Sequence, residues 1–347
     1  MVKNYIILNA ILSILTSQTL LGMSCVINQK PISSIPTTNG SSLGFTSNDC
    51  LAVLADTFLG IGFNIYSPTS TSCSYNNEPG TIFGQQGSTE MPLVLAVSRG
   101  NCLAYADGTG RILIYSSTCP GCAVAQTNTL SLSPTAMGFS NNNCLVVGDA
   151  NGNINIYTSS PSSSCNYTSS APSFTIPSGA QVNVIASSPS MNNCLAIGDV
   201  NGNVYIYSGV SDCTYNTTTP QTIALGGVIN DIAFSGSDCL AIADNSGRVT
   251  TYKPGVNCTS YTLATTISGL AAPSSLAFSP SECLAIGNND GSVGLYSSIN
   301  NCMYNTTATS SIKRNGNQVS SIAFSFSNPA CLAVAFKDAI NIYSFSS

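Results

Sequence analysis

Apolar and polar residues are arranged in a unit that returns seven times along the chain. The unit is clearest in CLAIGDVNGNVYIY, which runs from Cys194 to Tyr207. A short apolar run, a polar turn with glycine in its fourth position and an alternating run that ends in tyrosine are typical of a β-hairpin. The other copies start at Cys50, Cys102, Cys144, Cys239, Cys283 and Cys331, so successive copies begin 42 to 52 residues apart. A repeat of this length indicates one supersecondary unit per repeat.

Two further strands flank each hairpin. An apolar run such as INDIAFSGSD precedes it, and a Ser-rich loop, a second cysteine and a looser run such as CTYNTTTPQTIAL follow it. Each repeat is therefore predicted to form a four-stranded sheet. We interpret the acidic residues of the hairpin turns as turn-forming rather than calcium-binding, because the further carboxylates of a calcium loop are missing. These residues are Asp107, Asp149, Asp199, Asp244 and Asp290.

The segment INDIAFSGSDCLAIADNSGRVTTYKPGVNC, residues 229 to 258, resembles the repeat of WD-repeat propellers, with that family's AFSPDG-like turn, its DG turn and a strand that ends in an aromatic residue. The resemblance implies an all-β fold, a seven-bladed β-propeller of four-stranded blades. The chain has neither Trp nor His, so the family's His–Asp–Trp hydrogen-bond network is absent. Tyrosines stand where the family has Trp: Tyr66, Tyr115, Tyr157, Tyr207, Tyr252, Tyr296 and Tyr343.

The two ends of the chain are predicted to meet in one blade. The last hairpin is followed by no outer strand, because the chain ends at Ser347. The segment from Cys25 to Cys50 matches the segment from Cys213 to Cys239, which joins an outer strand to the next blade. We therefore expect the N-terminal strand to close the last blade, with residues 25–347 forming a single propeller.

Residues 1–24 are predicted to be a signal peptide. Lys3 is followed by an apolar stretch from Tyr5 to about Leu15 and then by the small residues Gly22 and Ser24, which is the order of such a segment. The stretch is too short for a comfortable membrane span, so we expect a secreted or extracytoplasmic protein without a transmembrane span. Cleavage before Cys25 also resembles a lipoprotein site, which leaves a lipid anchor at Cys25 as the alternative.

Fifteen cysteines fit an oxidising compartment. Seven open the hairpins, and the second position holds Cys73, Cys122, Cys165, Cys213, Cys258, Cys302 and, across the chain ends, Cys25. We expect each pair to form within its blade, with Cys25 bonded to Cys331 and Cys119 left as a free thiol. Two strand spacings, about 9.6 Å, separate the paired positions, whereas a disulfide needs Cα atoms within roughly 7 Å. Pairing between neighbouring blades therefore stays open.

Charge and composition limit the chemistry. Only 7% of the residues are charged and the net charge is −5, which argues against nucleic-acid binding because that depends on many phosphate contacts. A chain without His cannot run His-dependent catalysis and offers no imidazole to a metal. Cys119 and Cys122 form a CxxC motif without the helix of a redox site. We therefore expect no cofactor, no metal and no enzymatic activity.

The leading hypothesis is a module that binds or displays a protein or a glycan. A propeller hydrolase, which would need acids that converge on the channel, and a surface structural component are the alternatives. Lys313 and Arg314, the one local concentration of charge, are candidate contact residues. Five N-x-[ST] sequons are candidate glycosylation sites: Asn39, Asn166, Asn216, Asn257 and Asn305.

Overall fold

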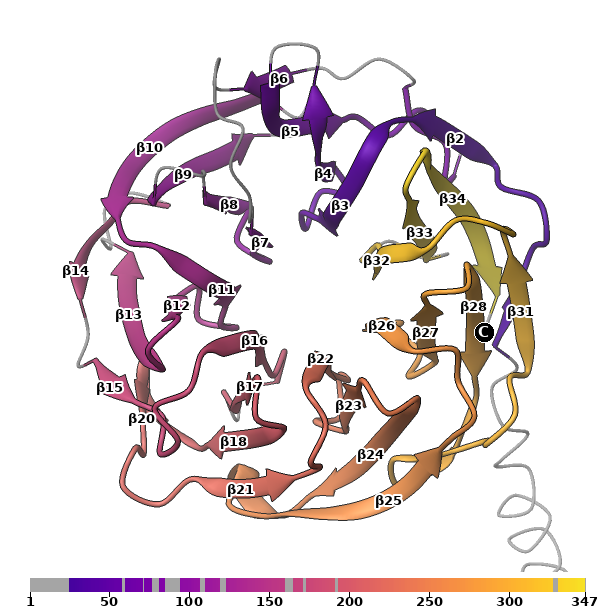
Figure 1. Ribbon diagram of the computed structural model, residues 1–347. Coiled ribbons are helices and arrows are strands. Elements are labelled where there is room, and N and C mark those ends of the chain that lie inside the picture. Colours follow the sequence, from indigo (N-terminus) through magenta and orange to yellow (C-terminus); the bar gives the residue numbers. More distant parts are fainter. Residues whose placement is uncertain are drawn as a thin grey trace, which may run out of the picture.

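A computed structural model describes most of the chain after residue 24. The described residues are 25–57, 60–70, 72–76, 81–84, 94–106, 110–118, 123–159, 165–170, 173–190, 193–326 and 330–346. The predicted signal peptide, Asp107, Cys119 and Cys122 lie outside them. Seven antiparallel sheets stand around a central channel like the blades of a propeller (Figure 1).

Each blade contains four strand positions in order from the channel outward. The inner strands are β3 (Thr38–Phe45), β7 (Leu95–Val97), β11 (Pro134–Phe139), β16 (Val182–Ser187), β22 (Ile229–Phe234), β26 (Pro273–Phe278) and β32 (Val319–Phe324). The second strands are β4 (Leu51–Thr57), β8 (Cys102–Ala106), β12 (Leu145–Asp149), β17 (Leu195–Asp199), β23 (Leu240–Asp244), β27 (Leu284–Asn288) and β33 (Cys331–Phe336). We number the blades 1 to 7 in this order.

The third strands complete the predicted hairpins, and the outer strands vary more in length, from two residues in β15 to nine in β10. The third strands are β5 (Gly60–Tyr66), β9 (Arg111–Thr118), β13 (Asn153–Ser159), β18 (Asn203–Tyr207), β24 (Arg248–Pro254), β28 (Ser292–Tyr296) and β34 (Ala339–Ser346). The outer strands of blades 1 to 6 are β6 (Thr81–Gly84), β10 (Ala123–Ser131), β14 (Tyr167–Ser170) with β15 (Phe174–Thr175), β21 (Gln221–Ala224), β25 (Tyr261–Ile267) and β31 (Ser310–Lys313). Loops between third and outer strands carry the hairpins β19 (Gly209–Ser211)–β20 (Thr214–Tyr215) and β29 (Ser298–Asn300)–β30 (Met303–Tyr304), and the 3₁₀ turn η1 (Val256–Cys258).

The N-terminus supplies the outer edge of blade 7, as predicted. β1 (Val26–Ile27) and β2 (Ser33–Pro36) both pair antiparallel with the C-terminal strand β34. Figure 1 shows β2 and β34 side by side although they lie at opposite ends of the sequence. The ring is therefore closed by backbone hydrogen bonds between the first and last strands.

The apolar core lies between the blades. Leu43 and Leu51 of blade 1 pack in one cluster with Ala333 and Ile342 of blade 7, and equivalent clusters join the other neighbours. Because both faces of a blade are covered, the second strands are almost continuously apolar and buried. The tyrosines at the hairpin ends belong to this core. All but the half-buried Tyr157 are buried: Tyr66, Tyr115, Tyr207, Tyr252, Tyr296 and Tyr343.

The turn residues act as the sequence indicated. The Asp199 carboxylate accepts bonds from the backbone N–H groups of Asn201 (2.9 Å) and Asn203 (2.8 Å). Asp149 makes the equivalent bonds in blade 3, so both carboxylates hold the hairpin turn in shape. Gly202 completes the turn with a φ of 85°, in the region that favours glycine.

Candidate functional site

Between described residues, six disulfides join neighbouring blades. The bonds are Cys25–Cys283, Cys73–Cys331, Cys102–Cys165, Cys144–Cys213, Cys194–Cys258 and Cys239–Cys302. Each joins the first cysteine of one blade to the second cysteine of the next. Cys50 is also disulfide-bonded, and the same rule predicts Cys122 as its partner.

The expected pairing within blades, with Cys25 bonded to Cys331, is therefore wrong, and pairing between neighbours is correct. The physical reason is the distance across a sheet. Within a blade a third strand separates the two positions, whereas between blades the Cα atoms lie 5.3 to 5.9 Å apart. Five of the second cysteines have a left-handed backbone, with φ between 56° and 66°: Cys73, Cys165, Cys213, Cys258 and Cys302. Because the Cys25 sulfur is bonded to Cys283, the lipid-anchored alternative does not apply to this form.

A buried hydroxyl group holds the turn that leads into each first cysteine. Cys102 donates its N–H to Oγ of Ser98 at 2.8 Å, and Cys331 donates its N–H to Oγ of Ser325 at 2.8 Å. The hydroxyl-bearing residues occupy the same place in every blade and are almost fully buried: Thr46, Ser98, Ser140, Ser188, Ser235, Ser279 and Ser325. This ring of turns surrounds the end of the channel where the inner strands finish.

A second set of tyrosines, which the sequence reasoning missed, packs beside the disulfides. The Tyr167 hydroxyl donates to the carbonyl of Asn143 at 2.7 Å, and the Tyr75 hydroxyl donates to the carbonyl of Asp49 at 2.9 Å. Burial raises the pKa of both phenols, so they remain neutral donors. The recurring Cys-x-Tyr pattern at the second cysteine was the available signal.

Hydrogen bonds between inner strands link blades 5, 6, 7 and 1 around the channel. The Asp231 carboxylate accepts the N–H of Leu276 at 2.6 Å, Oγ of Ser275 accepts the N–H of Ile322 at 3.0 Å, and Oγ of Ser321 accepts the N–H of Leu43 at 3.3 Å. In a chain that lacks the His–Asp–Trp network, these bonds link neighbouring blades directly.

A cavity of about 370 Å³ lies around the first half of the inner strands, and among its described lining residues Asp231 is the one that is acidic. Desolvation raises the pKa of Asp231 to about 6, although hydrogen bonds from Leu276, Ile232 and Ser275 oppose the shift. The carboxylate is thus engaged in blade packing. The described lining holds no second acid beside it, whereas a two-carboxylate hydrolase site uses a pair.

A second cavity at the other end of the channel has three phenylalanines in its lining, together with Arg99 and several serines. We call this cavity the aromatic mouth; its volume is about 200 Å³ and its lining includes Phe139, Phe234, Phe326, Arg99 and Pro189. Phe326 is 41% exposed, and its ring lies 5.0 Å from the Arg99 guanidinium carbon. Desolvation lowers the pKa of Arg99.

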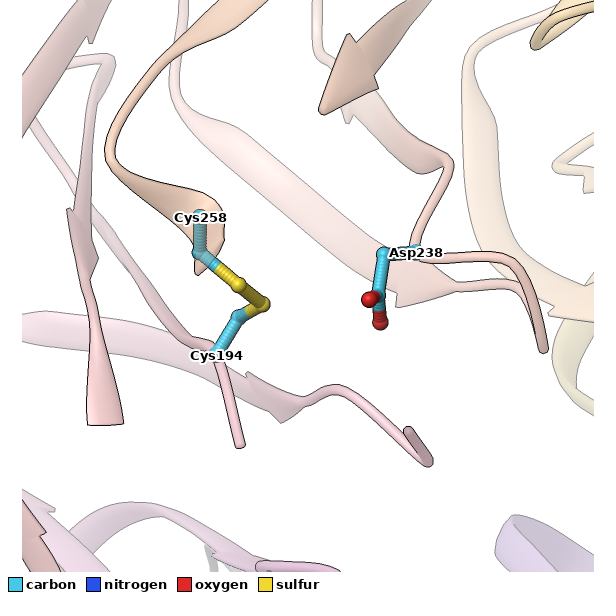
Figure 2. Close-up of side chains that lie close together, drawn as sticks. All are labelled: Cys194, Asp238 and Cys258. Atoms are coloured by element: carbon cyan, nitrogen blue, oxygen red, sulfur yellow. A yellow bond between two sulfur atoms is a disulfide. The ribbon is translucent and has the colours of Figure 1, made fainter. Parts of the chain in front are cut away.

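One group of potential metal ligands consists of Cys194, Asp238 and Cys258. Figure 2 shows that the two sulfur atoms are bonded to each other, with the Asp238 carboxylate to one side. Asp238 accepts hydrogen bonds from Ser188 and, at 2.7 Å, from Ser190. Since metal binding to cysteine requires the thiolate, the disulfide form of this group does not provide a metal site.

The predicted contact residues are engaged in ion pairs. Lys313 lies 2.7 Å from a carboxylate oxygen of Asp290, and Arg314 lies 2.6 Å from one of Asp338. Among the sequons, Asn216 and Asn257 are exposed and Asn166 and Asn305 are half-buried, while Asn39 lies in β3. Binding at Lys313 and Arg314 and glycosylation both stay predictions.

The arrangement defines a WD-repeat-like seven-bladed propeller. No protein-family model and no curated protein sequence matches the chain. Among solved structures, the Raptor crystal structure from Chaetomium thermophilum superposes with a TM-score of 0.71 at 14% identity. That match covers 96% of this chain and 30% of the Raptor chain. A chain in the crystal structure of a mitotic checkpoint complex superposes with a TM-score of 0.69 at 15% identity, and the match covers 93% of this chain and 94% of that chain.

The comparisons show a shared fold. Within the described residues, no helix is long and apolar enough to cross a membrane. The interblade disulfides indicate an oxidising environment.

Proposed function

We propose that the chain is a secreted propeller that binds a protein or glycan and has no enzymatic activity of its own. The supporting observation is the aromatic mouth, a concave site that leaves the Phe326 ring 41% exposed at the end of the channel. Exposed aromatic side chains in a concave setting are typical of binding sites. We also propose that residues 1–24 are a signal peptide that is removed on secretion.

The disulfides suit such a role because they hold the blades in fixed positions. Ligand binding is stronger when the site is already ordered, since less entropy is lost on association. The similarity to a chain of a mitotic checkpoint complex is consistent with a propeller that serves as an interaction module.

A binding experiment with an enzymatic counter-assay tests the proposal. Oxidised protein would be immobilised and screened against a random peptide display library and a glycan array. We expect an enriched ligand class whose binding is lost in Phe326→Ser, a replacement with the residue that blade 1 carries at the equivalent turn position, Ser47. The same protein would be incubated with model lactones and nitrophenyl glycosides.

Turnover that disappears in Asp231→Ser would instead support a hydrolase. Failure to enrich any ligand, together with concentration-dependent assembly in sedimentation, would favour the surface structural alternative. The intact mass of the secreted protein tests signal-peptide cleavage and glycosylation together, because cleavage before Cys25 and any added glycan change the mass in the same spectrum.

A further inference from the structure

One position of the repeat carries unusual residues at the aromatic mouth. It directly follows the buried hydroxyl-bearing residue of each turn. Around the ring the position holds Ser47, Arg99, Asn141, Pro189, Gly236, Pro280 and Phe326. Five blades use a small residue, Asn or Pro here, so the turn itself requires neither the arginine of blade 2 nor the phenylalanine of blade 7.

These two residues meet although blade 1 lies between their blades. The Arg99 guanidinium lies over the Phe326 ring, with 5.0 Å between its central carbon and the ring centroid. The described ion pairs engage Arg248, Lys313 and Arg314, and none of them involves Arg99. Within the part of the chain that the structure describes, Arg99 is therefore a cation with no carboxylate at ion-pair distance, and it lies over an aromatic ring at the mouth.

The nearby carboxylates are already engaged. Asp49 accepts the backbone N–H of Phe326 at 3.1 Å, and Asp238 accepts from Ser188 and Ser190. The hydroxyls of Ser98 and Ser140 likewise accept cysteine N–H groups. The described lining of the mouth thus offers a ligand the Arg99 charge and the exposed Phe326 ring, beside the polar groups of Ser98, Ser140 and Asn141.

We propose that the aromatic mouth binds an acidic peptide segment of a partner protein, with an apolar side chain on the phenyl rings and a neighbouring carboxylate at Arg99. The cavity of about 200 Å³ is below the roughly 300–1,000 Å³ of sites that enclose a drug-sized ligand. It therefore takes one side chain rather than a whole molecule. A peptide is favoured over a sugar because the mouth places the Arg99 charge beside the exposed Phe326 ring, and an acidic peptide supplies both a carboxylate and an apolar side chain, whereas a neutral sugar does not use the charge. This inference rests on the proposed binding function and specifies its ligand.

Fluorescence anisotropy tests the inference with a defined probe. The probe is the labelled heptapeptide Gly-Ser-Glu-Glu-Phe-Glu-Glu, compared with versions in which Gln or Lys replaces every Glu. We expect saturable binding of the acidic peptide, at least about tenfold weaker binding of the Gln version, and none of the Lys version. Arg99→Asn introduces the residue that blade 3 carries at this position. This substitution should lower the affinity for the acidic peptide by a similar factor.

Lys253→Asn provides a matched control. Lys253 lies in the outer pocket beside the Cys239–Cys302 disulfide, and its replacement removes the same charge away from the mouth. We expect it to change the affinity less than twofold. The thermal unfolding midpoints of both variants would be measured to confirm that each is folded.

Three outcomes would overturn the inference. They are equal losses in Arg99→Asn and Lys253→Asn, absence of saturable binding of the acidic peptide, and heparin binding that depends on Arg99 while the peptide does not bind. If library ligands bind the native protein and Arg99→Asn equally well, the proposed binding function stands and the acidic-peptide inference alone falls. If no ligand of any class binds, both fail.

Discussion

Replacing Cys25 and Cys331 together by serine removes two disulfides, because the two residues bond different partners. In the structure Cys25 pairs with Cys283 and Cys331 pairs with Cys73. The double variant therefore leaves two unpaired thiols in different blades. A matched variant, Cys25→Ser with Cys283→Ser, removes one bond and leaves no new thiol.

The size of the effect follows from the loops that these bonds close. While one of the two bonds is intact, the other closes roughly 100 residues of the cross-linked unfolded chain, which corresponds to about 4.7 kcal/mol in the chain-entropy model. For a chain of this size that loss lowers the unfolding midpoint by about 7 °C. The variant that loses both bonds should drop by about twice as much, a large fraction of the roughly 5–15 kcal/mol by which domains are stable.

Alkylation in denaturant followed by intact mass counts the thiols, and thermal unfolding gives the midpoints. We expect two additional alkylated thiols in Cys25→Ser/Cys331→Ser and none in Cys25→Ser/Cys283→Ser. Should the first variant fail to fold, non-reducing peptide mapping of the native protein gives the same answer. The reasoning is refuted if the Cys25 peptide is joined to the Cys331 peptide, or if the first variant shows no added thiols.

Three other substitutions test the packing between blades. Asp231→Ser keeps a hydroxyl acceptor but removes a carboxyl group whose pKa the fold raises to about 6. The folded state therefore binds the carboxyl proton more tightly than the unfolded state does. As the pH rises from about 4 to 6 and this proton is lost, the native protein loses stability. The variant lacks this loss. The difference in unfolding free energy between the variant and the native protein, measured by denaturant titration, should therefore shift in favour of the variant by up to about 3 kcal/mol between pH 4 and pH 6. A difference that does not change with pH would contradict the raised pKa of Asp231. Tyr167→Phe leaves the Asn143 carbonyl without its 2.7 Å bond and should cost about 1–3 kcal/mol in the same titration; no loss would mean that the bond contributes nothing. Gly198→Ala places a Cβ 2.7 Å from the Cγ2 methyl of Ile229 in the next blade and 2.8 Å from a methyl of Val184 in its own blade, and should cost about 1–3 kcal/mol. If the clash across the blades is the cause, the same change should cost less in an Ile229→Ala background, which lacks the Cγ2 methyl.

The amino-acid sequence by itself determined the structure of the repeating blade and the number of blades. A hairpin is formed by residues close together in the sequence. It can therefore be predicted from about a dozen residues, by the alternation of apolar positions and by turn residues such as Asp199 and Gly202. The closure of blade 7 could also be predicted, because the segment after Cys25 repeats the segment after Cys213.

Only the tertiary structure decided how equivalent positions of different blades meet. Every blade carries the same two cysteines, so a repeating pattern does not say whether Cys25 reaches Cys331 in its own blade or Cys283 in the neighbouring one. The strand spacing decides this. Likewise Arg99 and Phe326 are far apart in sequence and occupy ordinary turn positions, and they come together only because closure of the ring sets the mouth of the channel between them.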